Sequence, residues 1–299
     1  MPTIPHLYKR RSKALALSAI TTATLLAFPA HAIDVDAGDY TALPAGTSLG
    51  LVYYQHATRD KLYAGGNQVA INPKLTSDIG IVRGVHFMEI GGYIVDPQFL
   101  LPFGKLSAKN DIAALGSNSG VGDLQLAATV WLTKPGDKTH FGITPFISAP
   151  TGQYDRNDPL SLGENRWKYA LQAGFITPLA DKVMLDLAAD VQIHGKNKDF
   201  GASSATMEQK PLFQAQAFLR YQLSATTDLR TGVSHTTGGQ TTLNGVRQDD
   251  RIATTKFQVG VAHFLSAKTQ VLATYGRDTS VRQGFKEDGR INLRLLQIF

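Results

Sequence analysis

The residue pair best placed for chemistry is Ser234-His235, because hydrolysis by a serine nucleophile needs a histidine base within hydrogen-bond reach. Both residues stand in a stretch that alternates apolar and polar side chains, and adjacent residues of a β-strand point to opposite faces. Ser234 and His235 therefore cannot serve each other directly. The other strand histidines have no serine two places away on the same face: His86, His140, His194 and His263. The sequence predicts no catalytic residue, and a hydrolase acting on membrane lipids is the less favoured alternative.

Metal and nucleotide sites need residue spacings that the sequence does not contain. Asp155 and Asn157 could open a calcium-binding loop, but Leu160 stands where such a loop needs a glycine for its sharp turn. Gly65-Gly66 opens no helix, so a glycine-rich phosphate loop is not predicted. The loop histidines and loop acids do not have the spacing of a ligand set. We therefore expect neither a metal nor a cofactor.

Ionisable residues recur on the polar faces of the alternating segments. These faces carry seven acids and five bases: Asp78, Asp96, Asp123, Lys168, Asp186, Asp190, Arg220, Asp228, Arg230, Lys256, Asp278 and Arg294. Opposite charges on neighbouring strands, such as Asp186 or Asp190 beside Arg220, can pair and leave little net field. If the polar faces point into the lumen of a β-barrel, most of these residues are expected to form structural ion pairs along the barrel wall. Only a few are expected to line the path of a solute.

The same faces also carry apolar side chains, among them Tyr54, Phe146, Ile176 and Phe218. A narrow lumen with this mixed lining suits a small, partly apolar solute better than free diffusion of ions. The residues assigned to the lumen lining are Asp186, Asp190, Arg220, Arg230, Lys256, Phe146 and Phe218. Arg83 falls on the lipid-facing side of its segment, which predicts a bulge or a register error there.

β-Strands must carry these residues, because the dominant hydrophobic period is two. A helix would scatter the apolar residues of 212–223 around its axis. Twelve segments of about 9 to 14 residues have a strand pattern, close to the 9 to 11 tilted residues that cross a bilayer. They are Thr47–Gln55, Ser77–Phe87, Tyr93–Phe103, Val121–Leu132, His140–Ser148, Trp167–Thr177, Val183–Ile193, Leu212–Leu223, Asp228–Thr236, Arg251–Phe264, Thr269–Asp278 and Arg290–Phe299.

The connections between these segments alternate between long polar loops and short turns, as in bacterial outer-membrane barrels. An even number of strands places both ends of the mature chain on the periplasmic side. The long loops 63–70, 153–165 and 197–209 are expected to restrict the external mouth. Tyr154 and Trp167 could form an aromatic vestibule there, although we favour Trp167 as an anchor at the membrane interface.

The first 32 residues have the pattern of a cleaved signal peptide. A basic stretch, an apolar run of about 15 residues and the motif Ala30-His31-Ala32 follow in order, and the run is too short to span a membrane. Residues 33–46 are expected to be a periplasmic lead-in, and residues 47–299 a single barrel domain.

Without the leader the net charge falls from +6 to +2, so the basic pI does not indicate a nucleic-acid partner. The chain has no cysteine and therefore no disulfide.

The chain ends on an aromatic residue, Phe299, in an alternating strand pattern. If Phe299 faces lipid, then Ile291, Leu293 and Leu295 do so too, whereas Gln297 departs from the apolar row. A terminal phenylalanine of this kind resembles the signal that directs outer-membrane proteins to barrel assembly. Because lipid offers no hydrogen-bond partners, the last strand must pair with the first, residues 49–55, to close the sheet.

Four stretches carry a likeness that covers nearly the whole mature chain: IDVDAGDYTALPAGTSLGLVYYQHATRD from Ile33, LGENRWKYALQAGF from Leu162, LRYQLSATTDLRTGVSHTTGGQTTLNGV from Leu219 and YGRDTSVRQGFKEDGRINLRLLQIF from Tyr275. They resemble a family of outer-membrane proteins associated with the meta-pathway of phenol degradation, the MetA type. The resemblance implies a barrel of Gram-negative bacteria and passage of aromatic or other small hydrophobic compounds. It supplies no functional residues that could be assigned to positions in this chain.

The sequence therefore predicts an all-β, closed, antiparallel transmembrane β-barrel of twelve strands in the cell outer membrane. We expect it to admit small hydrophobic or aromatic compounds passively and not to be an enzyme. Its expected partners are outer-membrane lipids, the solute, and the barrel-assembly machinery, which would bind the C-terminal strand. A lipid hydrolase and a structural or adhesive barrel without transport are the alternatives.

Overall fold

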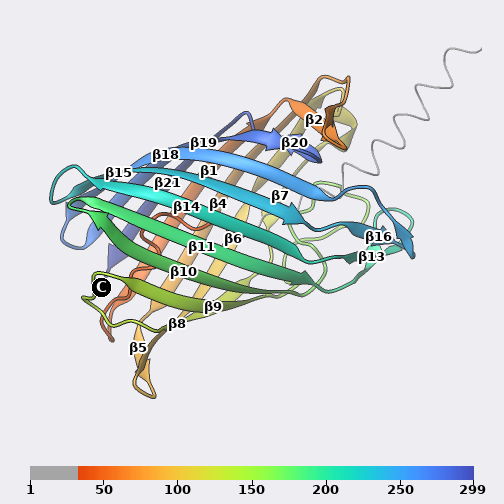
Figure 1. Cartoon of the computed structure of the whole chain (residues 1–299). Helices are drawn as coiled ribbons and strands as arrows, with labels where there is room; N and C mark the ends of the chain where they lie inside the picture. Colours follow the sequence, from red (N-terminus) through yellow and green to blue (C-terminus); the bar gives the residue numbers. More distant parts are fainter. Residues whose placement is uncertain (1–32) are drawn as a thin grey trace, which may run out of the picture.

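The computed structural model describes residues 33–299, and the signal peptide predicted for residues 1–32 lies outside them. Within the described range most residues belong to strands, and the long strands wind into a barrel (Figure 1). No helix of residues 33–299 is long and apolar enough to cross a membrane. In this range twelve strands form the barrel: β1 (Ser48–Arg59), β4 (Pro73–His86), β6 (Tyr93–Asn110), β8 (Gln125–Trp131), β9 (His140–Ser148), β10 (Lys168–Ala180), β11 (Val183–His194), β14 (Leu212–Gln222), β15 (Thr227–Gly238), β18 (Ile252–Ser266), β19 (Thr269–Val281) and β21 (Gly289–Ile298).

The barrel is closed by the pairing of its first and last strands. β1 pairs with β21 from Leu49↔Ile298 to Thr58↔Gly289, and β4 pairs with both β1 and β6. Each of the twelve strands thus has a partner on either side, and the backbone hydrogen bonds that lipid cannot supply are made within the sheet. The prediction of a closed antiparallel barrel of twelve strands is confirmed.

Apolar and polar side chains are distributed over the two surfaces of the barrel wall in the reverse of the way found in a water-soluble protein. Large apolar side chains are exposed around the outside, for example Val52, Phe99, Leu187, Leu219 and Leu293. Many of the buried side chains on the inside are polar or charged. An apolar patch of this extent is stable against lipid and not against water, so this is an outer-membrane barrel.

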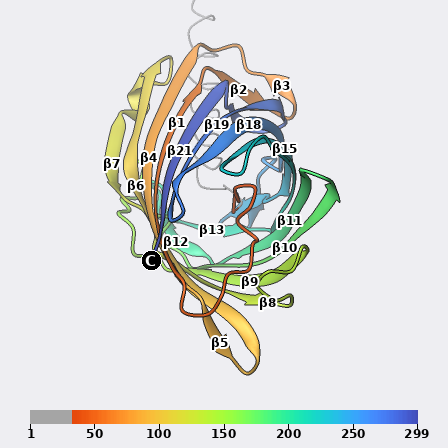
Figure 2. The same ribbon diagram turned by 90° about the vertical axis from the view of Figure 1, so that its left-hand side faces the viewer.

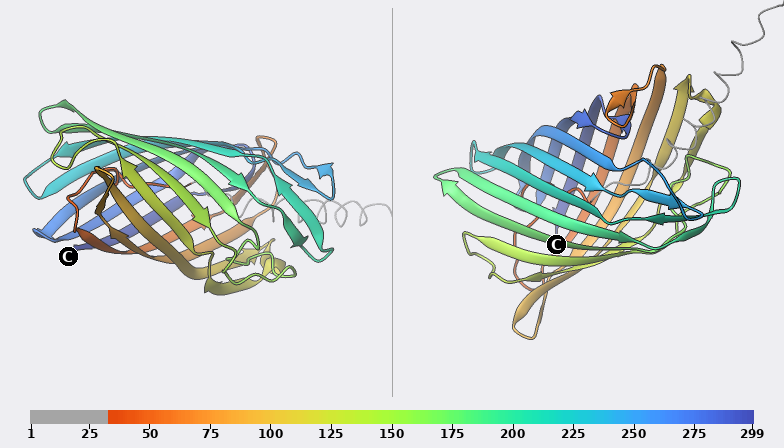
Figure 3. Two further views of the ribbon diagram at one scale, coloured as in Figure 1. Left: turned by 90° about the horizontal axis from the view of Figure 1, so that it is seen from below. Right: turned by 45° about the vertical axis from the view of Figure 1, so that its right-hand side comes forward.

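Small sheets extend the strands at the end of the barrel that lies away from the C-terminus and carries the long loops (Figures 1 and 3). One joins β12 (Asn197–Phe200), β13 (Ala205–Gln209), β16 (Thr241–Leu243) and β17 (Val246–Arg247). Another joins β2 (Lys61–Ala64), β3 (Asn67–Gln68) and β20 (Gly284–Lys286). The short strand β5 (Met88–Ile90) pairs with β6 at the opposite end, in the short connection between β4 and β6 (Figure 1). At the end with the long loops, β7 (Ser117–Val121) pairs with β6, and a short helical turn, η1 (Ala113–Leu115), precedes β7. The long loops at this end thus have structure of their own.

The predicted strand Val121–Leu132 is divided in the structure. β7 ends at Val121 and β8 begins at Gln125, and the three residues between them leave the ladder. The reason is the carboxylate of Asp123, which accepts hydrogen bonds from the backbone N–H groups of Gly152 (2.9 Å) and Glu164 (3.1 Å). The loop that contains Gly152 and Glu164 therefore contacts the wall at the break between β7 and β8.

The face assignment of β1 and β4 was wrong. Tyr54 and Asp78 point to the outside, where the hydroxyl of Tyr54 and the Nδ1 atom of His56 each lie 2.7 Å from Asp78 Oδ1. Arg83 points into the barrel, and β1 and β4 pair without the register shift that was predicted around it. Both faces of these strands carry polar residues, so alternation alone could not decide which face is buried.

Residues 33–46 differ most from the expectation. They were expected to be a periplasmic lead-in, but the segment runs inside the ring of strands before it enters β1 (Figure 2). Residues 33–46 are called the plug below. Its backbone polar groups can be buried there because the inner wall supplies hydrogen-bond partners.

Candidate functional site: the lumen and its plug

Tyr40 fixes the plug against the inner face of β9 and β10. Its hydroxyl lies 2.9 Å from Thr144 Oγ1 and 2.9 Å from Gln172 Oε1. Its ring packs edge-on to the ring of Trp131, with centroids 5.9 Å apart. The ring also covers Gly174, where an added Cβ would lie 2.0 Å from it. Glycine at this position is therefore what allows the plug to approach the wall.

Arginines on the two strands that flank β1 hold the acidic residues of the plug. Arg294 Nη1 on β21 lies 3.0 Å from Asp36 Oδ2 and 2.8 Å from Asp39 Oδ1. Arg83 Nη1 on β4 lies 3.2 Å from Asp39 Oδ2. These groups are mostly buried, and removing one partner of a buried pair typically costs about 3–5 kcal/mol because the other charge is left uncompensated. The plug is thus an electrostatic complement of the wall.

The lumen residues Asp186 and Arg230 also contact the plug, and Arg220 is paired with Asp186. Arg220 Nε lies 3.0 Å from both carboxylate oxygens of Asp186, which also accepts a hydrogen bond from the backbone N–H of Gly38. Arg230 donates to the carbonyl oxygen of Ala37. A cavity of only about 10 Å³ remains where Ala37 meets the wall, space for about one water molecule. The plug and the wall are therefore closely fitted at this level.

The other residues assigned to the lumen lining also lie on the inner face, but not in one cluster. Phe218 is buried on β14 against Gly232, where an added Cβ would lie 2.1 Å from its ring. Phe146 is buried on β9, which is three strand pairings away from β14. Lys256 Nζ on β18 lies 3.4 Å from Glu287 Oε2 and 3.6 Å from Asp34 Oδ2. Asp190 on β11 is buried and, within residues 33–299, forms no ion pair.

The loop of residues 149–167 contains the segment 153–165 that was expected to restrict the external mouth. Its buried carboxylate, Glu164, contacts Arg166 (2.7 Å) and Lys168. Burial alone would raise the pKa of Glu164, but the two cations lower it to about 2. From the same loop, Leu160 inserts completely into an apolar cluster with Leu75 of β4. The loop is thus fastened to the wall by both charge and apolar contact.

Histidine–hydroxyl pairs occur on the outer face of the wall. The structure brings together Ser48 with His86 (2.8 Å), Thr227 with His263 (2.8 Å) and His235 with Thr255 (2.9 Å). The sequence missed these pairs because the partners lie on different strands. A hydrolytic triad also needs a third group that orients the histidine, and none is found for His86 in residues 33–299. A hydroxyl that satisfies an outward histidine nitrogen accounts for the pairs.

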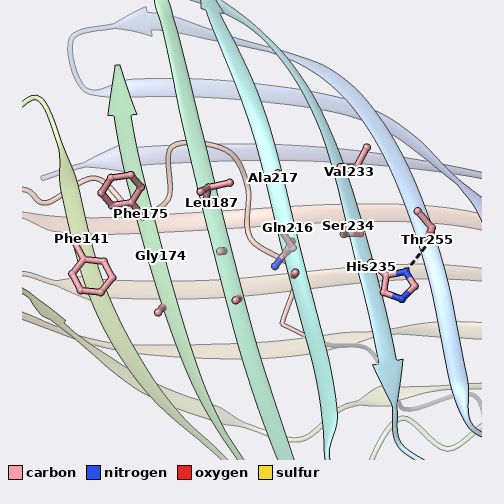
Figure 4. Close-up of a pocket in the computed structure, with 14 residues that line it drawn as sticks. Phe141, Gly174, Phe175, Leu187, Gln216, Ala217, Val233, Ser234, His235 and Thr255 are labelled. Atoms are coloured by element: carbon pink, nitrogen blue, oxygen red, sulfur yellow. Dashed lines mark hydrogen bonds between the residues drawn. The ribbon is translucent and has the colours of Figure 1, made fainter. Parts of the chain in front are cut away.

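A hollow lies on the outside of the barrel. It measures about 500 Å³ and spans β9 to β18 on the lipid-facing wall (Figure 4). Small side chains form its floor, including Ala173, Ala189 and Ala215, with Phe175 and Leu187 beside them. His235 at its edge bonds to Thr255, and its neighbour Ser234 belongs to the inner face, opposite Lys256. The hollow is therefore a feature of the lipid contact and not of the lumen.

Sequence reasoning missed the plug and the residues that hold it. The available signal was charge: three acids, Asp34, Asp36 and Asp39, precede a barrel whose inner face is rich in arginine. Neither Arg83 nor Tyr40 was considered as a lumen residue, because Arg83 was placed on the wrong face and Tyr40 outside the barrel.

The sequence profile of one protein family matches residues 58–295, and the family is described as "Putative MetA-pathway of phenol degradation". The chain belongs to this family. Its barrel is also similar to the COG4313 outer membrane channel from Pseudomonas putida F1, with 45% sequence identity, a TM-score of 0.86, and coverage of 89% of this chain and 100% of that one.

Two autotransporter barrels are similar in fold alone. The β domain of BrkA from Bordetella has a TM-score of 0.50 and 10% identity, with coverage of 86% of this chain and 100% of that one. The transport unit of AIDA-I from Escherichia coli has a TM-score of 0.50 and 8% identity, with coverage of 95% and 96%. No curated protein matches the chain.

Proposed function

We infer that this protein is an outer-membrane channel for the passive uptake of small hydrophobic or aromatic compounds. The observation that carries this proposal is a closed barrel whose mixed polar and apolar interior is filled by its own residues 33–46. A permanently open aqueous pore would not need such a plug. The family match and the likeness to a channel with 45% identity support the same function.

Passage through the lumen requires the plug to move. Its attachments differ in kind, with ion pairs to Arg83 and Arg294 and a packed ring at Tyr40. An apolar solute would cross the mixed lining near Phe146 and Phe218, while ions would meet a wall whose charges are mostly paired with one another. Selection would then depend on the lining and on the rate at which the plug moves.

The test is uptake by lipid vesicles that contain the purified protein. Wild-type protein should speed the entry of toluene and phenol over protein-free vesicles and have little effect on glucose. Deletion of residues 33–46 should raise uptake of all three, because the filled lumen becomes an open one. Equal uptake of aromatic solutes with and without the wild-type protein would reject the channel.

The two alternatives make different predictions for the same vesicles. A lipid hydrolase would release fatty acid, and Ser48→Ala or Ser234→Ala would abolish the release. A structural or adhesive barrel would neither release fatty acid nor speed uptake. The proposal that the protein is not an enzyme is supported by the relatives, among which the similar chain at 45% identity is a channel.

A further inference from the structure

Asp190 on β11 is a buried carboxylate that has no counter-charge among residues 33–299. Only 5% of the residue is exposed, and no donor of the described residues is bonded to its Oδ1 atom. Its hydrogen-bond partners are neutral amides: its Oδ2 atom accepts from Gln172 Nε2 at 3.3 Å, and Gln192 also bonds to the carboxylate. Asp186, two positions earlier on the same face, is paired with Arg220, but Asp190 pairs with no cation of residues 33–299. A buried, uncompensated charge is costly, so a group that offsets it is expected.

Other oxygen atoms surround Asp190. Gln214 on β14 is its direct cross-strand partner and is equally buried, and within the part of the chain that the structure describes no donor bonds to its Oε1 atom. Gln214 Nε2 donates to Asp34 Oδ1 of the plug at 2.9 Å. The carbonyl oxygen of Ile33 lies within the same group, because it accepts from Gln172 Nε2 at 2.9 Å. The plug thus contributes oxygen atoms beside two wall oxygens that are unused.

The neighbouring cations are already shared by other carboxylates. Lys256 and Arg290 each contact Asp34, and each also contacts Glu287. Asp34 and Asp190 interact electrostatically with each other, so the second carboxylate adds to the negative potential at Asp190. Neither cation forms an ion pair with Asp190 in the described chain. The local field therefore favours a positive ion.

We propose that Asp190 Oδ1 and Gln214 Oε1, with the Asp34 carboxylate, bind an inorganic cation that ties the plug to β11 and β14. Carboxylate, amide and backbone oxygens without sulfur or imidazole are the ligands of hard cations, and Ca²⁺ accepts such mixed sets together with water. Residues 33–299 contain no group of three His, Cys, Asp or Glu side chains arranged for a metal, so the site depends on the amide oxygen and on water. This role does not depend on which solute passes.

The first test is calorimetric titration of CaCl₂ into the full-length mature protein, purified in detergent and stripped with EDTA. Wild type should bind Ca²⁺ at one site. Asp190→Asn should weaken binding by about tenfold or more, because the amide keeps the shape and removes the charge. Gln214→Leu should weaken it less. Asp96→Asn is the matched control, since Asp96 is a buried lumen carboxylate whose oxygens are bonded to Trp131 and Thr129, and it should bind as wild type.

Thermal unfolding gives a second readout that does not depend on transport. A cation that binds only the folded barrel raises the melting temperature, so Ca²⁺ should stabilise wild type and the Asp96→Asn variant but not Asp190→Asn. NaCl at the same ionic strength separates specific binding from screening. The proposal is overturned if wild type binds no Ca²⁺, or if Asp190→Asn binds it as tightly as wild type. If NaCl alone raises the melting temperature of wild type, the site binds a monovalent ion, and the assignment of a divalent cation is overturned.

Discussion

The charges of individual side chains in the lumen are balanced within small groups of neighbouring residues and not across the whole inner wall. Arg294 is held by two plug carboxylates, Glu164 by Arg166 of its own loop and Lys168 of β10, and Asp186 by Arg220. Because each group is buried, its charges act on one another at close range and with little screening. A substitution should therefore have an effect that is local in place but large in magnitude.

Glu164 provides a pH test of this view. Its pKa of about 2 in the folded protein lies below the ordinary value of 4.5, so its contribution is complete above pH 4.5 and is lost as the pH falls toward 2. The shift corresponds to about 3 kcal/mol. The free energy of unfolding of wild type, measured with urea in detergent, should fall by that order between pH 5 and pH 2 relative to Glu164→Gln. A difference between the two proteins that stays constant with pH would contradict this.

At the scale of elements, the strands are shaped by what packs on their inner face. β10 has a glycine where the Tyr40 ring lies, and β14 places Phe218 over a glycine of β15. The break between β7 and β8 follows from Asp123, which binds a loop in place of a neighbouring strand. The register within the barrel is otherwise set by hydrogen bonding and by the turns.

Gly174→Ala on β10 tests the contact between strand and plug. The added methyl group would overlap the Tyr40 ring, so the plug must move away and lose the hydrogen bonds to Thr144 and Gln172. We expect a loss of about 1–3 kcal/mol in stability together with faster solute entry into vesicles. Ala173→Ser adds one atom to the adjacent, outward-facing residue and should change neither. Unchanged uptake in Gly174→Ala would show that the plug does not limit passage.

For the whole molecule, closure joins the two ends of the sheet. The backbone N–H of Phe299 bonds to the carbonyl oxygen of Ser48 at 2.9 Å, directly beside the β1–β21 ladder. The Phe299 ring is 71% exposed and contacts the position of Gly50 on the outer face. Its side chain therefore contributes little to packing. We propose that it serves recognition by the assembly machinery.

Phe299→Ala separates assembly from stability. In cells the variant should give clearly less folded barrel in the outer membrane, measured as the band that migrates differently on gels with and without heating. The barrel that does form, once purified, should differ from wild type by no more than about 0.5 kcal/mol, because an exposed side chain is removed. Leu295→Ala, another outward residue of β21, is the matched control and should assemble normally. Normal assembly of Phe299→Ala would exclude the recognition role.

The sequence by itself determined the strands, their number and their closure, because alternation with period two and the lengths of loops and turns are local properties of the chain. It also placed Asp186 and Arg220 on one face, since both lie on strongly alternating strands. Only the tertiary structure decided the faces of β1 and β4, the pairing of Arg83 with Asp39, and the place of residues 33–46. Those outcomes depend on which groups meet inside a closed wall, and a segment with no hydrophobic period carries no local signal that it will be buried there.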